Sequence, residues 1–363
     1  MTPLKLKSFS TFLIPLMLAF LSLLLVPVGL LLIYVWILQV RENEMNPLYL
    51  FLFAGCGFII GYLCFLQVAK AFRQRFRVMI TGIRTMMDGD RKMLQSTMPI
   101  SSTDEFGQLG LAFNDLQKYI AGQYAEVERE LQLAFVVQQN LLPQNEHSIA
   151  GFHIAALCRQ TKEVGGDFYD IVSLNEGKFA IIVGDVVGKG LQAALLMTVV
   201  MSLFRREIRV GGTAGDVLVR LNRQLFQALQ GQLFITAGLA IFDRNESTLT
   251  YANAGHMPPY LLREGRLAEE IHPSLPLGII AEATYQSHII DYPQGTRFVM
   301  YTDGMVESQR EDGEMIGFES FERYLLELSE GKLLEQAEAL MERISVSIDR
   351  RREDDRTVVI VER

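Results

Sequence analysis

Four aspartates in the C-terminal half of the chain could do chemistry together. They are Asp167, Asp185, Asp303 and Asp354, and each stands near a glycine or an arginine at the end of a predicted strand. One aspartate in such a place usually forms a turn or caps a helix, but four indicate a shared site if the strand ends meet. Carboxylate oxygens without histidine or cysteine around them are ligands for hard cations such as Mg²⁺ or Mn²⁺. Two such ions, held close together, can activate a water molecule to hydrolyse a phosphate ester.

The spacing of the first two aspartates predicts how they meet. Residues 167–172 (DFYDIV) and 178–184 (KFAIIVG) have the composition of strands, and Asn, Glu and Gly between them favour a reversal of the chain. Asp167 and Asp185 are each nine residues from Glu176, one before it and one after it. A hairpin that turns near Glu176 therefore brings both carboxylates to its open end.

The other two aspartates flank a second pair of predicted strands. Residues 297–302 (RFVMYT) end next to Asp303, while Asp354 and Asp355 directly precede residues 356–362 (RTVVIVE). Helical segments are expected between these strands. One of them has six apolar residues with the spacing of a buried helix face: Leu333, Ala337, Leu340, Met341, Ile344 and Ile348.

The motifs around these aspartates occur in the order of a known family. They are QQNLLP (138–143), GGDFYD (165–170), GDVVGKG (184–190) followed by AALLM, NAGHMPP (253–259), PLG (276–278), YTDGMVES (301–308) and DDRT (354–357). Residues 138–363 thereby resemble the SpoIIE/RsbU-type bacterial serine phosphatases of the metal-dependent PPM class. The resemblance implies an α+β domain in which helices flank an antiparallel β-sandwich. It also implies two Mn²⁺ or Mg²⁺ ions in a cleft between the sheets, and phosphoserine or phosphothreonine proteins as substrates.

Carried over motif by motif, the resemblance gives each acidic residue a role. Asp185 would bridge both metal ions, and the backbone carbonyl of Val186 would supplement the second ion. Asp303 and Asp354 would hold the first ion, and Asp167 would act on the second ion directly or through water. Asp185 and Asp303 are thus the residues expected to be catalytic.

Groups that bind phosphate or donate a proton are harder to assign. The wider class has a histidine two residues after the bridging aspartate, where this chain has Val187, and His256 of NAGH is expected to be structural. Arg159, Lys162 and Lys189 are the candidates for binding the substrate phosphate. Lys189 lies in a glycine-flanked turn, so a solvated surface lysine is the alternative.

The N-terminal region, residues 1–69, has the composition of a membrane anchor. No charged residue occurs from Ser8 to Val40 or from Met45 to Ala69, and each stretch exceeds the roughly 20 residues with which a helix crosses a bilayer. We therefore expect two transmembrane helices, at about 10–39 and 47–69, with a short outside loop. A signal peptide is the alternative, but the first apolar run is too long and no small-residue cleavage site ends it.

Charges around the two expected spans predict their orientation. Two lysines precede the first span, and one lysine and three arginines follow the second within residues 70–77, whereas the loop between the spans has one arginine and two glutamates. The positive-inside rule then places both termini and the catalytic domain on the cytoplasmic side of a bacterial inner membrane.

The formal charge of −8 does not suit nucleic-acid binding, so we expect no nucleic-acid partner.

The segment between the membrane and the phosphatase motifs is expected to be helical. Residues 70–122 resemble a HAMP domain, with an acidic entry at Asp104 and Glu105 to the second helix; a juxtamembrane helical hairpin is the alternative. Apolar residues then recur every seven positions from Phe113 to Leu141. This repeat predicts a coiled-coil signalling helix at 123–142 and a homodimer, unless the helix packs alone on the domain at 143–363.

Other function classes fit the sequence less well. A diguanylate cyclase needs a second acid where Phe168 stands, and GDVVGKG has neither the spacing of a P-loop nor its Ser or Thr. A histidine kinase would carry a phospho-accepting histidine in residues 113–142, which contain none. A phosphatase-like domain that only binds a partner is a further alternative. The preferred prediction is a membrane-anchored, signal-regulated phosphatase, and the family implies a phosphorylated anti-sigma-factor antagonist (STAS-type) protein as its substrate.

Overall fold

The computed structural model describes residues 105–363 and a scattered set of residues between 28 and 84. Within 105–363, the exceptions are residues 162–163, 176, 270–271, 311–312, 329–330 and 348–353. The chain divides into two compact units, Met1–Tyr124 and Ala125–Arg363. The second unit contains all four aspartates and is the one that bears on chemistry.

In the N-terminal unit, the described residues between 28 and 84 are helical. Among these described residues, no helix has both the length and the apolar content needed to span a bilayer. The expected spans at 10–39 and 47–69 fall largely outside the described residues, as does the connector expected in the HAMP-like region. Both therefore stay predictions.

Helix α3 (Glu105–Leu141) crosses the boundary between the two units without a break. Its start agrees with the acidic entry read from the sequence, although Asp104 lies outside the described residues. Of the residues in the seven-residue repeat, Phe113 is buried, whereas Val127 is 54% exposed. Tyr124, which with Leu131 reinforces the repeat at the same spacing, is 65% exposed. The repeat thus leaves apolar side chains uncovered on the middle of the helix.

The second unit is built on two antiparallel sheets. In spatial order, the six-stranded sheet contains β1 (Glu146–Ile149), β2 (Phe152–Arg159), β11 (Arg356–Glu362), β10 (Arg297–Tyr301), β7 (Tyr260–Arg263) and β8 (Arg266–Glu269). The five-stranded sheet contains β3 (Phe168–Asn175), β4 (Lys178–Val186), β5 (Ile235–Asp243), β6 (Thr248–Ala254) and β9 (His288–Asp291).

Strands β4 and β11, in the interior of the two sheets, are buried on both faces, and their side chains alternate between two cores. On β4, Phe179, Ile181 and Val183 pack between the two sheets, whereas Ala180 and Ile182 pack against helices. Successive side chains of a strand point to opposite faces, so a continuous apolar run is what a strand buried on both faces requires. On β11, residues 359 and 361 face the other sheet while residues 358 and 360 face helices.

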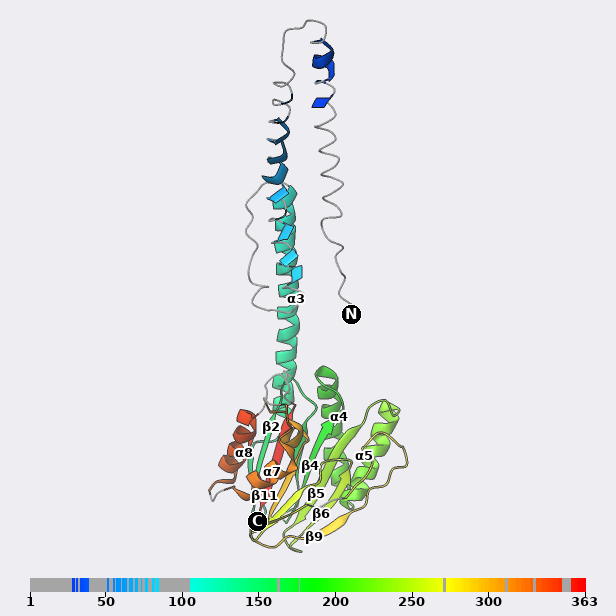
Figure 1. Cartoon of the computed structure of the whole chain (residues 1–363). Coiled ribbons are helices and arrows are strands. Elements are labelled where there is room, and N and C mark those ends of the chain that lie inside the picture. The colour runs from blue at the N-terminus through cyan, green and yellow to red at the C-terminus, as the bar shows by residue number, and fades with distance from the viewer. Residues whose placement is uncertain are drawn as a thin grey trace. The chain divides into compact units, whose positions relative to one another are not determined.

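Helices cover the outer face of each sheet (Figure 1). Helices α4 (Leu191–Val210) and α5 (Ala214–Leu229) pack on the five-stranded sheet. Helices α6 (Gly304–Glu307), α7 (Gly317–Leu326) and α8 (Leu333–Ser347) pack on the six-stranded sheet. The result has the layers helix, sheet, sheet, helix, and it confirms the α+β sandwich that the resemblance implied.

Candidate active site

Strand pairing brings the four aspartates to one end of the sandwich. In the β3–β4 hairpin, Phe168 pairs with Gly184, so the next residues outward are Asp167 and Asp185. In the β10–β11 ladder, Tyr301 pairs with Val358, which places Asp303 beside the start of β11, directly after Asp354 and Asp355. The hairpin predicted from the spacing around residue 176 is thus confirmed, although residue 176 itself lies outside the described residues.

Asp167 connects the two sheets. Its side chain is buried, and its Oδ2 accepts hydrogen bonds from the hydroxyls of Thr302 at 2.6 Å and Thr357 at 2.8 Å. Asp167 precedes β3 of one sheet, whereas the two threonines belong to the β10–β11 ladder of the other. Burial and the nearby carboxylate of Asp185 raise the pKa of Asp167 well above its usual range. The carboxylate is held in a fixed position but is costly to ionise without a cation.

Asp185 ends the run of buried residues on β4 and is only half-buried. Burial, followed by the charges of Asp303, Asp354 and Asp355, raises the pKa of Asp185 to about 7. The pKa of Asp303 is raised as well, by burial and then by Glu307 and Asp354. Mutual repulsion of this kind marks a site that a cation would stabilise, and clustered perturbed carboxylates are typical of functional sites.

Two glycines let the backbone approach these carboxylates closely. A Cβ on Gly166 would lie 2.7 Å from the carbonyl oxygen of Val186 and 2.9 Å from Oδ1 of Asp185. Both distances are too short for any side chain, so glycine is required there. The backbone of Gly166 thus lies directly against the carbonyl and the carboxylate expected to bind metal.

Asp355 has a different role from its neighbour Asp354. Its Oδ1 accepts hydrogen bonds from the backbone N–H of Thr161 at 2.9 Å and from the Thr161 hydroxyl at 2.8 Å. Its Oδ2 accepts a hydrogen bond from the N–H of Gly166 at 3.1 Å. Asp355 therefore holds the loop that leads into Asp167. The resemblance implied at most a supporting role for Asp355, because the wider class often has asparagine at this place.

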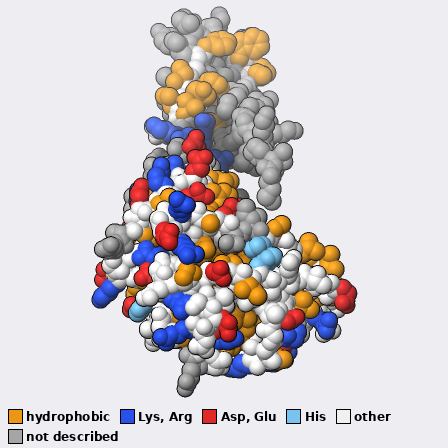
Figure 2. Space-filling view, turned by 90° about the horizontal axis from the view of Figure 1, so that it is seen from below, with side chains coloured by type: hydrophobic (Ala, Val, Ile, Leu, Met, Phe, Trp, Pro, Cys, Tyr) orange, Lys and Arg blue, Asp and Glu red, His pale blue; other side chains and the backbone are white. Residues whose placement is uncertain are grey.

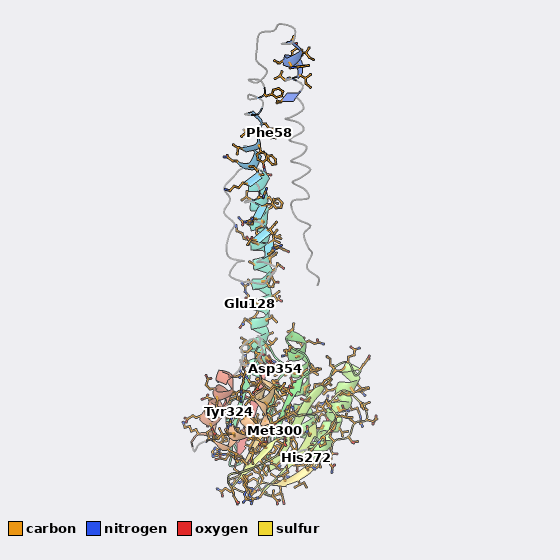
Figure 3. All side chains as sticks on the ribbon, viewed as in Figure 1. Phe58, Glu128, His272, Met300, Tyr324 and Asp354 are labelled. Carbon is orange, nitrogen blue, oxygen red and sulfur yellow. The ribbon has the colours of Figure 1, made fainter. Side chains whose placement is uncertain are left out.

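Lys189 pairs with Asp354. The Nζ of Lys189 lies 2.8 Å from Oδ1 of Asp354, and both side chains are about half exposed. Hydrogen bonding to Asp354, together with the charges of Asp355 and Asp303, raises the pKa of Lys189 although partial burial opposes it. The ammonium group is thus a counter-ion for the carboxylates. Figure 3 labels Asp354 at this end of the sandwich.

The chemistry of these donors fits a hard divalent cation. Four carboxylates and the carbonyl of Val186 offer oxygen ligands at one end of the sandwich. Asp303 and Asp354 raise the pKa of Asp185, and Glu307 and Asp354 raise the pKa of Asp303, so ionised carboxylates at this end repel one another. Within the described residues, no group of three or more histidine, cysteine, aspartate or glutamate side chains is already arranged to hold a metal ion. Asp354 turns to Lys189 instead, and one oxygen of Asp167 is occupied by the two threonines.

The expected phosphate-binding residues lie in different places. Arg159 contacts Glu342 at 3.4 Å and Ser345 at 3.3 Å on α8, and Lys162 lies outside the described residues. Lys189 is the one candidate among the described residues that contacts an expected metal ligand. These three assignments therefore stay predictions.

His256 is placed as a structural residue. It is buried, its Nδ1 lies 3.0 Å from the hydroxyl of Thr236, and its backbone is held by the side chain of Asn253. Burial lowers the pKa of His256 to about 4, so the imidazole is neutral near pH 7. A neutral buried ring supports the structural role expected from the sequence.

Sequence reasoning missed the two threonines that hold Asp167. Thr302 immediately precedes Asp303, and Thr357 ends the DDRT motif. The backbone N–H of Thr302 donates to the carbonyl of Thr357 at 3.1 Å, so the two residues are paired across the ladder. Their hydroxyls reach the other sheet, which a pattern along one strand cannot reveal.

The surface charge of the molecule is mixed, with Lys and Arg side chains lying among Asp and Glu on the face shown in Figure 2.

The comparisons with known proteins agree with this fold. The family described as Stage II sporulation protein E (SpoIIE) matches residues 175–363, just over half of the chain. The chain is 29% identical over 235 residues to the phosphoserine phosphatase RsbU of Bacillus subtilis, covering 61% of this chain and 70% of RsbU. It is 29% identical over 189 residues to the phosphoserine phosphatase RsbP of the same organism, covering 50% of this chain but only 46% of RsbP.

Solved structures show the same fold. The SiaA-PP2C domain of Pseudomonas aeruginosa superposes with a TM-score of 0.60 at 23% identity, covering 67% of this chain and 99% of that domain. The PP2C phosphatase domain of SpoIIE from Bacillus subtilis, with a fragment of its regulatory domain, gives a TM-score of 0.54 at 22% identity, covering 58% of this chain and 63% of that one.

The two packed antiparallel sheets, their flanking helices and the carboxylates at one end define a protein phosphatase of the PPM (PP2C) class. Within that class, the chain belongs to the SpoIIE family.

We expect Lys189→Ala to lower the Mn²⁺ concentration needed for half-maximal activity by roughly two- to fivefold, the worth of one exposed ion pair. Removing the ammonium group frees Asp354 and leaves the carboxylates without their internal counter-ion. A Mn²⁺ titration of activity measures this. Lys178→Ala is the matched control, because Lys178 pairs with Asp243 at the other end of the same sheet. A higher KM for the phosphorylated substrate with an unchanged Mn²⁺ requirement would instead make Lys189 a phosphate-binding residue.

Proposed function

We propose that this protein is a membrane-anchored, signal-regulated, metal-dependent phosphatase of phosphoserine and phosphothreonine proteins. The observation that carries the proposal is the meeting of Asp167, Asp185, Asp303 and Asp354 at one end of a PPM-type sandwich. The description of RsbU and RsbP as phosphoserine phosphatases supports the substrate class.

The ligand residues would divide between two Mn²⁺ or Mg²⁺ ions. Asp185 would serve both ions, Asp303 and Asp354 the first, and Asp167 with the carbonyl of Val186 the second. When bound, the ions supply positive charge for the phosphate oxygens and lower the pKa of water. This chemistry needs no covalent intermediate on the protein.

The chain's own residues orient this set. Thr302 and Thr357 fix Asp167, and Asp355 fixes the loop that carries Gly166 against Asp185. Water would attack phosphorus in line with the leaving serine or threonine oxygen. Val187 occupies the place of the histidine found in the wider class, and its side chain has no proton to donate. The leaving oxygen must therefore receive its proton from another group or from water.

The N-terminal part would connect a signal to this site. The uncharged stretches at 10–39 and 47–69 support a two-span anchor in a bacterial inner membrane, with the catalytic domain in the cytoplasm. The uncovered apolar side chains of Tyr124 and Val127 support a homodimer through α3 beneath a HAMP-like unit. Sedimentation of the detergent-solubilised full chain tests the dimer, and Val127→Asp is expected to make it monomeric.

The family suggests the substrate protein. Membership of the SpoIIE family favours a phosphorylated STAS-type anti-sigma-factor antagonist, whose dephosphorylation would release a sigma factor. A candidate antagonist, phosphorylated on one serine, would be incubated with the protein and its mass followed over time. Loss of one phosphate per molecule supports the assignment, whereas an unchanged mass beside active hydrolysis of an aryl phosphate points to another substrate.

Removal of metal tests the proposed activity directly. We expect the full chain to release phosphate from a phosphoserine protein in Mn²⁺ or Mg²⁺, to stop in EDTA, and to recover when excess Mn²⁺ is returned. The reason is that carboxylate oxygens meet at the site, whereas Cys158, whose Sγ lies 3.8 Å from the carbonyl oxygen of Asp167, is a poor nucleophile because burial raises the pKa of its thiol. If Mn²⁺ binds without any phosphate release from protein or aryl substrates, the domain acts as a partner-binding module. If no Mn²⁺ binds, the metal site assigned to these aspartates is wrong.

A further inference from the structure

The end of helix α3, together with Pro143 just beyond it, is attached to residues 165–170 by three sets of hydrogen bonds. The side chain of Gln138 bonds to the backbone of Gly165. The carbonyl of Leu141, the last residue of α3, accepts a hydrogen bond from Arg205, which also holds Asp170. The hydroxyl of Tyr169 donates to the carbonyl of Pro143 at 2.9 Å. All three reach residues 165–170, the GGDFYD motif that contains Asp167.

The Gln138 contact is the one closest to the metal ligands. Gln138 is only 2% exposed, its Nε2 donates to the carbonyl of Gly165 at 2.8 Å, and its Oε1 accepts from the N–H of Gly165 at 3.3 Å. One side-chain amide thus pairs with both polar groups of a single residue, as a neighbouring strand would. Because the site is buried, loss of the amide would leave the carbonyl and the N–H of Gly165 without these hydrogen bonds and would destabilise this arrangement of the backbone.

From Gly165 the contacts lead straight to the expected metal ligands. A Cβ on Gly165 would lie 2.0 Å from Oδ2 of Asp355, and the same oxygen accepts the N–H of Gly166. Gly166 in turn lies against Asp185 and the carbonyl of Val186, and the following residue is Asp167. Each of these contacts is close, so we expect a shift of Gly165 to displace Asp167 or the Val186 carbonyl.

The position of Gln138 in α3 connects it with the apolar repeat. Tyr124 and Leu131 are seven residues apart, and Gln138 is the next residue in that series. The repeat predicts an apolar residue at this position, but the side chain of Gln138 is buried within the second unit. A polar residue here is explained by the Gly165 contact and not by helix pairing.

We propose that Gln138 is a positioning residue through which helix α3 sets the cation affinity of the active site. It holds Gly165 so that Asp167 and the Val186 carbonyl stand ready for the second ion. A displacement of the helix end would be transmitted by the same amide, which makes Gln138 the coupling point between the regulatory helix and catalysis. This inference rests on the proposed metal-dependent function.

Gln138→Leu in the full chain tests the role, because leucine has a similar size but no polar groups. We expect the Mn²⁺ dissociation constant, measured by calorimetry on the metal-free protein, to rise about tenfold or more, the usual effect of losing a group that orients a ligand. The KM for the phosphoserine protein at saturating Mn²⁺ should not change. Gln138→Glu, which keeps an acceptor but no donor for the Gly165 carbonyl, should show the same shift.

Gln132→Leu is the matched control, since Gln132 is an exposed glutamine on the same helix. If Gln138→Leu and Gln138→Glu bind Mn²⁺ as Gln132→Leu does, the inference is wrong while the proposed function stands. If Gln138→Leu and Gln138→Glu unfold, Gln138→Asn is compared with the wild type by hydrogen exchange and Mn²⁺ binding. Faster exchange at Gly165 and Gly166 together with weaker Mn²⁺ binding supports the role of Gln138. Unchanged exchange and unchanged Mn²⁺ binding overturn it. If the wild-type protein binds no Mn²⁺, the proposed function itself fails, and the inference fails with it.

Discussion

Asp185→Asn is expected to reduce kcat/KM for a phosphoserine protein by at least about 10³-fold, because the interaction of phosphate oxygens with bound cations is worth several kcal/mol and each 1.36 kcal/mol is tenfold in rate. Asp185 is the carboxylate expected to serve both ions, so its loss should also remove the rise in melting temperature that Mn²⁺ causes in the wild type. Steady-state kinetics and thermal melts with and without Mn²⁺ measure the two effects. Asp291→Asn is the control, since Asp291 is an exposed residue at the far end of the same sheet.

The same substitution should stabilise the protein in the absence of metal. The pKa of Asp185 is raised to about 7 in the folded protein, whereas an aspartate in the unfolded chain titrates near about 3.9. Between these values the folded state binds the extra proton, so its stability falls as the pH rises from about 4 to about 7.

Asparagine cannot ionise and escapes this loss. In EDTA at pH 8, Asp185→Asn should melt above the wild type, by about 2–4 °C for each kcal/mol recovered, and the difference should vanish near pH 4. A variant that loses activity but melts below the wild type at pH 8 would contradict this account of Asp185. Activity, in contrast, should decline at acid pH as the site gains protons.

Gly304→Ala is expected to lower kcat/KM by about 100-fold or more, the cost of a misplacement of about 1 Å at a catalytic site. A Cβ at this position would lie 1.9 Å from the carbonyl oxygen of Asp355, 3.0 Å from its carbonyl carbon and 3.1 Å from Cγ of Arg356. Backbone cannot swing aside as a flexible side chain can. The start of β11 must therefore move away from Asp303, and Asp354 moves with it.

Gly304→Ala should also destabilise the fold by about 1–3 kcal/mol, the usual cost of overpacking. Kinetics and thermal melts of the variant check both effects. Gly122→Ala is the control, because a Cβ there meets nothing within 4 Å and alanine favours the helix. Wild-type kinetics in Gly304→Ala would show that the separation of Asp303 from β11 is not critical for the site.

The sequence was sufficient to predict the site wherever chemistry follows from pairing along the chain. Antiparallel pairing keeps the sum of partner numbers constant, so a turn near residue 176 was enough to place Asp167 opposite Asp185. The apolar segments at 297–302 and 356–362 were likewise predicted as strands, and they are observed as β10 and β11. The helix predicted from Leu333 onward is α8, and its five described apolar positions are buried.

Contacts between elements distant in the chain could not be predicted in this way. Thr302 and Thr357 reach Asp167 only because two different sheets pack face to face. Arg159, the last residue of β2, contacts Glu342 on α8 instead of the aspartates. Gln138 stood in a recognised motif, but nothing in its spacing revealed that it pairs with Gly165. Such contacts depend on how the sheets and helices pack on one another. The periodicity of a single sequence carries no information on that packing.

The bond between Asp167 and the two threonines has a consequence for the molecule as a whole. The two sheets are joined at this end by a carboxylate that the proposed metal site would also use. Cohesion of the sandwich and occupancy of the site are therefore thermodynamically linked, and each bound ion stabilises the native state according to its concentration relative to Kd. The domain would be hardest to unfold when it is ready to work, so its lifetime in the cell would follow the supply of divalent cations.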